Sequence, residues 1–458
     1  MKDNTQVFES YSVPRAVRTL ALPSMMGMLV NIVYNLADTF FVGQTGNANM
    51  VAAVSVTMPL FLLFIACGNL FGVGGCAFVS RSLGEGKTER VKTISSFCVY
   101  SAIGVGLVMT VLFLVFRKPV LYAVGASDAT FAYAADYLKY VAIGSPFIVS
   151  SVMLGNLVRG EGAARVSMIG SIIGQVVNIV LDPIFILNKG DKLFGLAMPF
   201  GAAIATVIGN VVSVIFFLIY FLRGKSILSI SPGRYRVRGG IARGVITVGL
   251  PAAINSLLMS ISNMLINVFL QAYGDNAVAA MGITMKANML VVMLQLGLAQ
   301  GVQPLVGYCY GANKLDRMRH SIRFSCVCNI VLGTVITVIY FIFTRQVVSV
   351  FIDDPAVIDY GVKMLRALMI SGPVIGCMFV LNFSFQGMGK GTQSMILSLS
   401  RQGLIYFPLL IIMNKTVGLD GIIWSQAVAD LVCTAMSVVM FLLVVRKLRR
   451  QHSQKTKA

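Results

Sequence analysis

The sequence predicts an all-α membrane protein with 12 transmembrane helices in two six-helix parallel repeats, an N-lobe and a C-lobe. The 458 residues are 57% hydrophobic and 12% charged, about half the charged fraction of an ordinary soluble domain. Apolar stretches of about 20 residues, enough to cross a hydrocarbon core of about 30 Å, recur along the chain. The third observation is an internal repeat.

The apolar stretches divide evenly around a long basic segment at residues 223–243. Six precede that segment and six follow it, so both repeats enter the membrane in the same direction. We expect the spans at residues 16–42, 51–79, 93–116, 135–157, 166–187, 196–222, 244–272, 277–308, 322–344, 362–385, 394–413 and 419–445.

The repeat is visible as a constant shift between the two halves of the sequence. Residues 51–167 align without a gap with residues 278–394, at a shift of 227. A shift held over so long a segment indicates duplication of one unit. The matched landmarks are Val51-Ala52-Ala53 with Val278-Ala279-Ala280, Pro146 with Pro373, Gly160-x-Gly162 with Gly387-x-Gly389 and, at one residue more, Leu22-Pro23 with Leu250-Pro251.

These observations give the domain organisation. We expect an N-lobe at 1–222, a cytoplasmic linker at 223–243, a C-lobe at 244–445 and a basic cytoplasmic tail at 446–458. Most of the 37 lysines and arginines lie at the termini and in the even-numbered connections, which the positive-inside rule assigns to the cytoplasm. The net charge of +20 therefore reflects orientation in a membrane, with both termini in the cytoplasm, rather than nucleic-acid binding. The expected location is a bacterial cytoplasmic (inner) membrane.

Enzymatic chemistry has no support in the sequence, and we expect no cofactor. The segment Gly387-Met388-Gly389-Lys390-Gly391-Thr392 lacks the spacing of a phosphate-binding loop. The two histidines, His320 and His452, lie in basic segments. A transporter with its site between two repeats fits the pattern better.

Three acids fall well inside predicted spans: Asp38, Asp182 and Asp430. A carboxylate at mid-membrane costs about 2.5–3.5 kcal/mol on insertion scales, so it normally has polar partners or carries a proton. Asp38 shares one helix face with Asn31 and Asn35, at spacings of seven and three residues. This polar face indicates a functional group.

Asp182 has a comparable environment in the fifth span. Asn178 lies one turn before it, and Pro183 follows it and frees a backbone carbonyl. Together the two acids could bind Na⁺ or share a proton; the alternative is that each only bonds helices together, which we favour for Asp430. In the second half, Ile266 and Leu409 align with Asp38 and Asp182.

At these residues the chain resembles the multidrug and toxic compound extrusion (MATE) family of secondary transporters, across nearly its full length. The matching motifs are Leu22-Pro23, Asp38-Thr39-x-x-Val42-Gly43, Asn178-x3-Asp182-Pro183, Gly201-Ala202-Ala203-Ile204-Ala205-Thr206, Gln300-Gly301-x-Gln303-Pro304 and Gly311-Ala312-Asn313. The resemblance implies two six-helix lobes in a V that expel lipophilic, mostly cationic drugs in exchange for H⁺ or Na⁺.

The resemblance also implies site residues. The first-lobe cation site, with Na⁺ as one possible ion, would comprise Asp38, Asn178, Asp182 and Thr206, and Pro23 would be the hinge of the first span. The branch of the family resembling NorM couples through carboxylates in spans 7 and 10. This chain has none there, which favours a site in the first lobe.

Two further residues, Tyr34 and Gln295, are candidate substrate contacts, and Lys286 is expected to snorkel or to form a structural pair. We expect a monomer in the lipid bilayer, since nothing signals oligomerisation. Two alternatives stay open: a lipid-linked precursor flippase of the same superfamily, which would need cationic residues in its cavity, and a channel or passive receptor.

Overall fold

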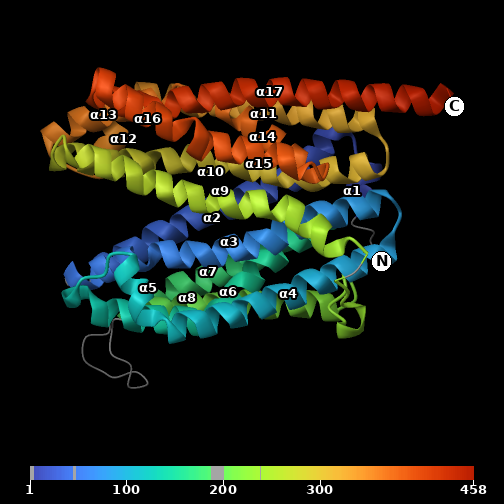
Figure 1. The fold of residues 1–458 in the computed structure, drawn as a ribbon, viewed down its shortest axis with the longest axis horizontal. Helices are drawn as coiled ribbons and strands as arrows, with labels where there is room; N and C mark the ends of the chain where they lie inside the picture. The colour runs from blue at the N-terminus through green and yellow to red at the C-terminus, as the bar shows by residue number, and fades with distance from the viewer. Residues whose placement is uncertain (1–4, 45–47, 187–200, 238, 458) are drawn as a thin grey trace.

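The computed structural model describes residues 5–44, 48–186, 201–237 and 239–457. Within these ranges, eleven helices are long and apolar enough to cross a membrane, and a bent helix pair brings the number to 12. Figure 1 shows them as a bundle with nearly parallel axes, with both chain ends at the same end of the bundle. The multi-pass prediction is therefore confirmed, while the part of the expected sixth span before residue 201 lies outside the described residues.

The helices of the first half follow one another in chain order. Their bounds are α1 (Gln6–Glu9), α2 (Val13–Gly43), α3 (Ala48–Gly84), α4 (Thr88–Val115), α5 (Arg117–Ala123), α6 (Asp128–Gly160), α7 (Ala164–Ile186) and α8 (Gly201–Leu222). The linker contains one turn of 3-10 helix, η3 (Pro232–Arg234).

The second half repeats this order. Its elements are α9 (Ile241–Gln271), α10 (Asp275–Gly311), α11 (Leu315–Ile342), α12 (Thr344–Ser349), α13 (Pro355–Met369), α14 (Gly372–Gly387), α15 (Gly391–Leu399), the π-helical turn η4 (Ser400–Leu404), α16 (Tyr406–Val417) and α17 (Leu419–Lys457).

The helix bounds reproduce the repeat seen in the sequence. Both ends of α10 lie 227 residues after those of α3, and both ends of α11 lie 227 residues after those of α4. The α2 and α9 pair keeps the shift of 228 that the Leu-Pro landmark predicted. The fold thus consists of two repeated halves.

The halves differ most at the tenth span, where the single helix α6 corresponds to the pair α13 and α14, bent by 49°. The bend leaves carbonyl groups without helical partners. Two side chains bond carbonyls at the bend: Gln295 Nε2 donates to the Gly372 carbonyl (2.7 Å) and Thr337 Oγ1 to the Met369 carbonyl (3.3 Å). Side chains of the second half therefore stabilise the bend between α13 and α14 by hydrogen bonds.

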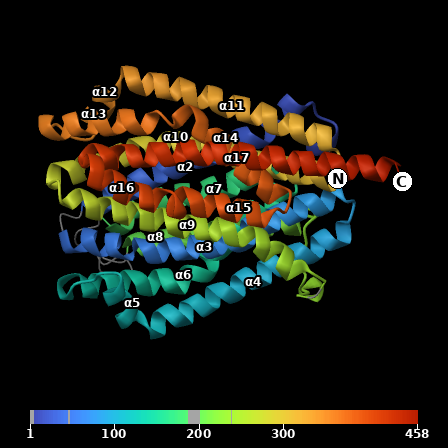
Figure 2. The same cartoon turned by 45° about the horizontal axis from the view of Figure 1, so that its top comes forward.

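The two halves meet through α2 and α10 on one side and through α3 and α9 on the other, and Figures 1 and 2 both show these pairs running alongside each other. A Cβ at Gly249 of α9 would overlap the Leu70 carbonyl of α3, and one at Gly311 would overlap the Arg81 carbonyl. These contacts lie in the parts of the helices nearest the chain ends. The halves are therefore closed at that end of the bundle.

Candidate functional site

The candidate site is assembled where α7 and α8 cross in close contact. A Cβ at Gly209 would overlap the Gly174 carbonyl, so glycine is what allows the two backbones to touch. This approach brings Asn178 and Asp182 on α7 next to Thr206 on α8, and all three side chains are buried.

The Asp182 carboxylate is fully buried and incompletely bonded. In the orientation that satisfies both ends of the Asn178 amide, its nitrogen donates to Asp182 Oδ2 (2.8 Å) and its oxygen accepts from the Thr206 backbone N–H (2.9 Å). Asp182 Oδ1 has no hydrogen-bond partner. Because an unpaired buried carboxylate oxygen is costly, this atom is the natural place for a proton or a small cation.

Helix α2 supplies the second acid. It packs against α7, and Tyr34 on α2 lies within electrostatic range of both Asp38 and Asp182. Asp38 also interacts with Asp182 and is only partly buried. The structure thus gathers the four residues implied as a cation site, together with the expected contact Tyr34.

The remaining first-half candidates lie along α2. Asn35 donates to the Asn31 carbonyl (2.7 Å) and to Asn31 Oδ1 (3.0 Å), so these amides bond each other rather than an acid. Pro23 is buried inside α2, between Ala21 and Met25, which contact glycines of α10 in the other half. A bend at Pro23 would therefore act directly on the contact between the halves.

The other candidate substrate contact, Gln295, lies apart from this cluster. It is fully buried in the second half, between α10, α11 and α14, where it bonds the Gly372 carbonyl. Lys286 is exposed on α10. Neither side chain joins Asp38 and Asp182.

Sequence reasoning missed part of the polar network. Gln175 lies three residues before Asn178 and seven before Asp182, and its buried Oε1 has no partner. Asn210 on α8 donates to the Thr206 carbonyl (2.8 Å). The helical spacing of Gln175 would have identified it, whereas the position of Asn210 depends on how α7 and α8 cross.

Asp430 has a different environment, a buried ion pair in the second half. Arg401 Nε donates to its Oδ1 (2.9 Å), as does Gln426 Nε2 (3.0 Å), and Ser371 donates to Oδ2 (3.3 Å). Arg401 also lies over the ring of Phe379 (5.0 Å). This geometry supports the helix-bonding role favoured for Asp430, and Arg401 is a partner that the sequence did not identify.

The π-helical turn around Arg401 also corrects an aligned position. Ile405 N bonds the Ser400 carbonyl (3.0 Å), five residues back, and such a turn holds one residue more than an α-helical one. Beyond it the counterpart of Asp182 is Leu410 rather than Leu409, and Leu410 is buried as Asp182 is. With Ile266 opposite Asp38, the second half has no acid at either place.

The donor set defines what the first-half site could hold. Within the described residues, no three His, Cys, Asp or Glu side chains converge as metal ligands do. The cluster instead offers two carboxylates, an amide and a hydroxyl. Such oxygen ligands suit a hard monovalent cation, and a carboxylate is equally able to take up a proton.

Comparisons with known proteins agree with this architecture. The MatE family profile matches residues 23–184 and again residues 251–412. The Multidrug export protein MepA of Staphylococcus saprophyticus is 32% identical over 445 residues, 97% of both chains, and that of Staphylococcus aureus strain N315 is 32% identical over the same share. A crystal structure of MATE in the straight conformation superposes with a TM-score of 0.92 at 25% identity, covering 98% of this chain and 99% of that one. The chain belongs to the MatE family of multi-pass membrane transporters.

Proposed function

We propose that this protein is a secondary active multidrug exporter that exchanges lipophilic, mostly cationic compounds for H⁺ or Na⁺ through Asp38 and Asp182. The observation that carries the proposal is the pair of interacting carboxylates in the first half, one of which has a buried oxygen without a partner. The relatives named Multidrug export protein support export of drugs.

The site works through a change of charge. With both acids ionised, the first half attracts a cationic compound; a proton or Na⁺ that reaches Asp182 Oδ1 removes that attraction. Tyr34 would respond to the change because it lies within electrostatic range of both acids. An ion binding preferentially to one conformation shifts the population toward it.

Helix α2 transmits the change to the rest of the molecule. Asp38 lies in the part of α2 that is away from the chain ends, and Pro23 lies where α2 contacts α10. Repacking of α2 around Pro23 would loosen or tighten that contact. Ion binding near one end of α2 is then linked to the contact between the halves near its other end.

The orientation follows from charge. With both termini in the cytoplasm, the closed end of the bundle is cytoplasmic, and the partly exposed Asp38 faces the outer side. An ion entering from outside then gains about 2.3 kcal/mol per elementary charge per 100 mV. The protein acts as a monomer in this scheme, since one chain supplies both halves.

Coupling belongs to the first half alone. Asp430 is neutralised by Arg401, and Ile266 and Leu410 occupy the positions of Asp38 and Asp182. This arrangement differs from the carboxylates in spans 7 and 10 of the NorM branch. It also argues against a flippase for lipid-linked pyrophosphates, which would need unpaired cations where this chain places acids.

Efflux of ethidium from cells tests the proposal. Asp38→Asn and Asp182→Asn should each abolish efflux at equal membrane expression, whereas Asp420→Asn, at an exposed acid of α17, should leave it unchanged. Collapsing the H⁺ and Na⁺ gradients separately names the ion. Normal efflux in Asp182→Asn would refute coupling through this site.

A further inference from the structure

An open cavity of about 540 Å³ lies where α11 begins and the far end of α17 passes over it. Four of its lining residues are cations, Lys314, Arg317, Arg319 and Arg449, and one is a carboxylate, Asp316. The volume falls within the range of about 300–1,000 Å³ typical of small-molecule sites. It lies at the end of the bundle that carries both termini, away from Asp38 and Asp182.

The positive charge of this cavity is poorly compensated. Asp316 pairs with Arg319 at 3.5 Å, but its own side chain is fully exposed, and exposed pairs contribute little. Arg317 donates one N–H to the Tyr11 carbonyl (2.6 Å). The Nε atoms of Arg317 and Arg319 are buried without a hydrogen-bond partner, so the protein itself leaves part of each guanidinium unsatisfied.

The backbone at the start of α11 adds to the positive potential of this cavity. Helix α11 is 28 residues long, and its N-cap residue Lys314 makes no side-chain capping bond. A helix N-terminus carries unsatisfied N–H groups and a partial positive charge that favours anions. The residue before it, Asn313, has a left-handed backbone (φ 59°) that turns the chain into the helix.

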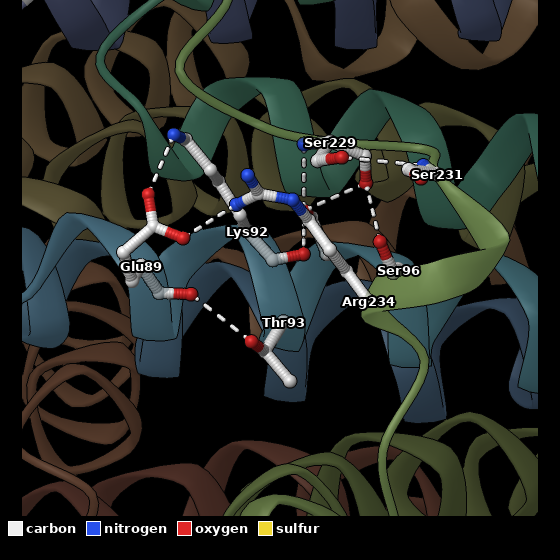
Figure 3. Close-up of polar contacts among 8 residues, drawn as sticks. Glu89, Lys92, Thr93, Ser96, Ser229, Ser231 and Arg234 are labelled. Carbon is white, nitrogen blue, oxygen red and sulfur yellow. Dashed lines mark hydrogen bonds and ion pairs between the residues drawn. The ribbon is translucent and has the colours of Figure 1, made fainter.

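The repeat supplies an internal comparison, because α4 begins in the same way as α11. At a shift of 227, Glu89 corresponds to Asp316 and Lys92 to Arg319. Figure 3 shows that Glu89 is engaged from two sides, by Lys92 (2.7 Å) and by Arg234 of the linker (2.6 Å). A second acid, Glu85, pairs with Lys87 (2.8 Å).

The second half has less of this neutralisation. The counterpart of Glu85 is Ala312, so one of the two acids is missing, while Arg449 of α17 brings a cation from a distant segment to the cavity, as Arg234 of the linker does at Glu89. The same local fold thus has two acids against its cations in the first half and only Asp316 against four cations in the second.

We propose that this cavity binds the phosphate group of an anionic phospholipid from the leaflet on the side of the termini. The headgroup would sit between Arg319 and Arg449. The acyl chains would run along the next turns of α11, where Val327, Val331 and Val335 are more than half exposed. Basic pockets at the ends of transmembrane helices take such headgroups.

Native mass spectrometry of the purified full-length protein with phosphatidylglycerol, phosphatidylcholine or inorganic phosphate tests the proposal. The variants are Arg319→Gln, Arg449→Gln and the double variant. Arg450→Gln is the matched control, since it removes the same charge from the neighbouring position of α17, outside the cavity lining. Size-exclusion profiles establish that each variant is folded.

We expect wild type to retain phosphatidylglycerol over phosphatidylcholine. Affinity should fall about fivefold for each cavity arginine removed and about 25-fold in the double variant, with no change in Arg450→Gln. Equal weakening in Arg450→Gln, or none in the double variant, would overturn the site. Binding of inorganic phosphate that is lost in the double variant, without lipid selectivity, would overturn the lipid assignment.

Discussion

Replacing Arg401 by methionine tests the structural role of the buried ion pair in the second half. The Arg401 and Asp430 side chains are 9% and 5% exposed, and their atoms lie 2.9 Å apart. Methionine removes the cation, while Gln426 and Ser371 still bond Asp430. Breaking one side of a buried pair costs about 3–5 kcal/mol because the remaining charge is uncompensated.

Replacing both partners gives a different expectation. Arg401→Met with Asp430→Leu removes both charges, and such replacement is often neutral or stabilising. Thermal unfolding of the detergent-solubilised protein should show a large destabilisation for Arg401→Met and a much smaller one for the double variant. Ethidium efflux should remain gradient-coupled in the double variant. A single variant no less stable than the double one, or loss of coupling in a stable double variant, would refute the assignment.

Three further predictions concern the contact between the halves, the cation site and the linker. Gly249→Ala should lower the free energy of unfolding by about 1–3 kcal/mol, because the added methyl group overpacks against Leu70. It should also increase the labelling of cysteines by thiol reagents at the closed end of the bundle. Unchanged labelling would contradict this prediction. Thr206→Val should weaken ion dependence of efflux about fivefold, by losing one hydrogen bond of about 1 kcal/mol. Burial raises the pKa of the Glu161 carboxyl, which accepts hydrogen bonds from Tyr220 of α8 and Ser226 of the linker. Stability should therefore fall as pH rises above the ordinary glutamate value, and Glu161→Gln should flatten that slope in thermal unfolding.

The sequence contained enough information for the helices and their duplication, because both are periodic or repeated signals. The shift of 227 found in the sequence also separates the bounds of α10 and α11 from those of α3 and α4 in the structure. The first-half cluster was predictable in part, since Asn178 and Asp182 share a helix face. Their contact with Thr206 came from family resemblance.

Other features depend on tertiary packing that no local pattern encodes. The partner of Asp430 lies 29 residues away on a π-helical turn, and only the fold brings the two together. Gln295 was a candidate substrate contact that no motif singled out, and in the structure it bonds the Gly372 carbonyl at the bend between α13 and α14. A buried polar residue in a span can hydrogen-bond a carbonyl at a helix bend as readily as it can contact a substrate.

The duplication explains why the two halves divide the work. Each half began with the same helices, so each could have held an acid at the positions of Asp38 and Asp182. In the second half those positions are Ile266 and Leu410, both buried in one apolar cluster, and the remaining buried charge is a closed pair with Arg401. In the mechanism that we propose, the incompletely bonded carboxylate of the first half exchanges its ion, and the second half is the packed partner against which α2 moves. An exporter needs one site that changes charge and one surface that responds to it, and divergence of a single repeat supplies both.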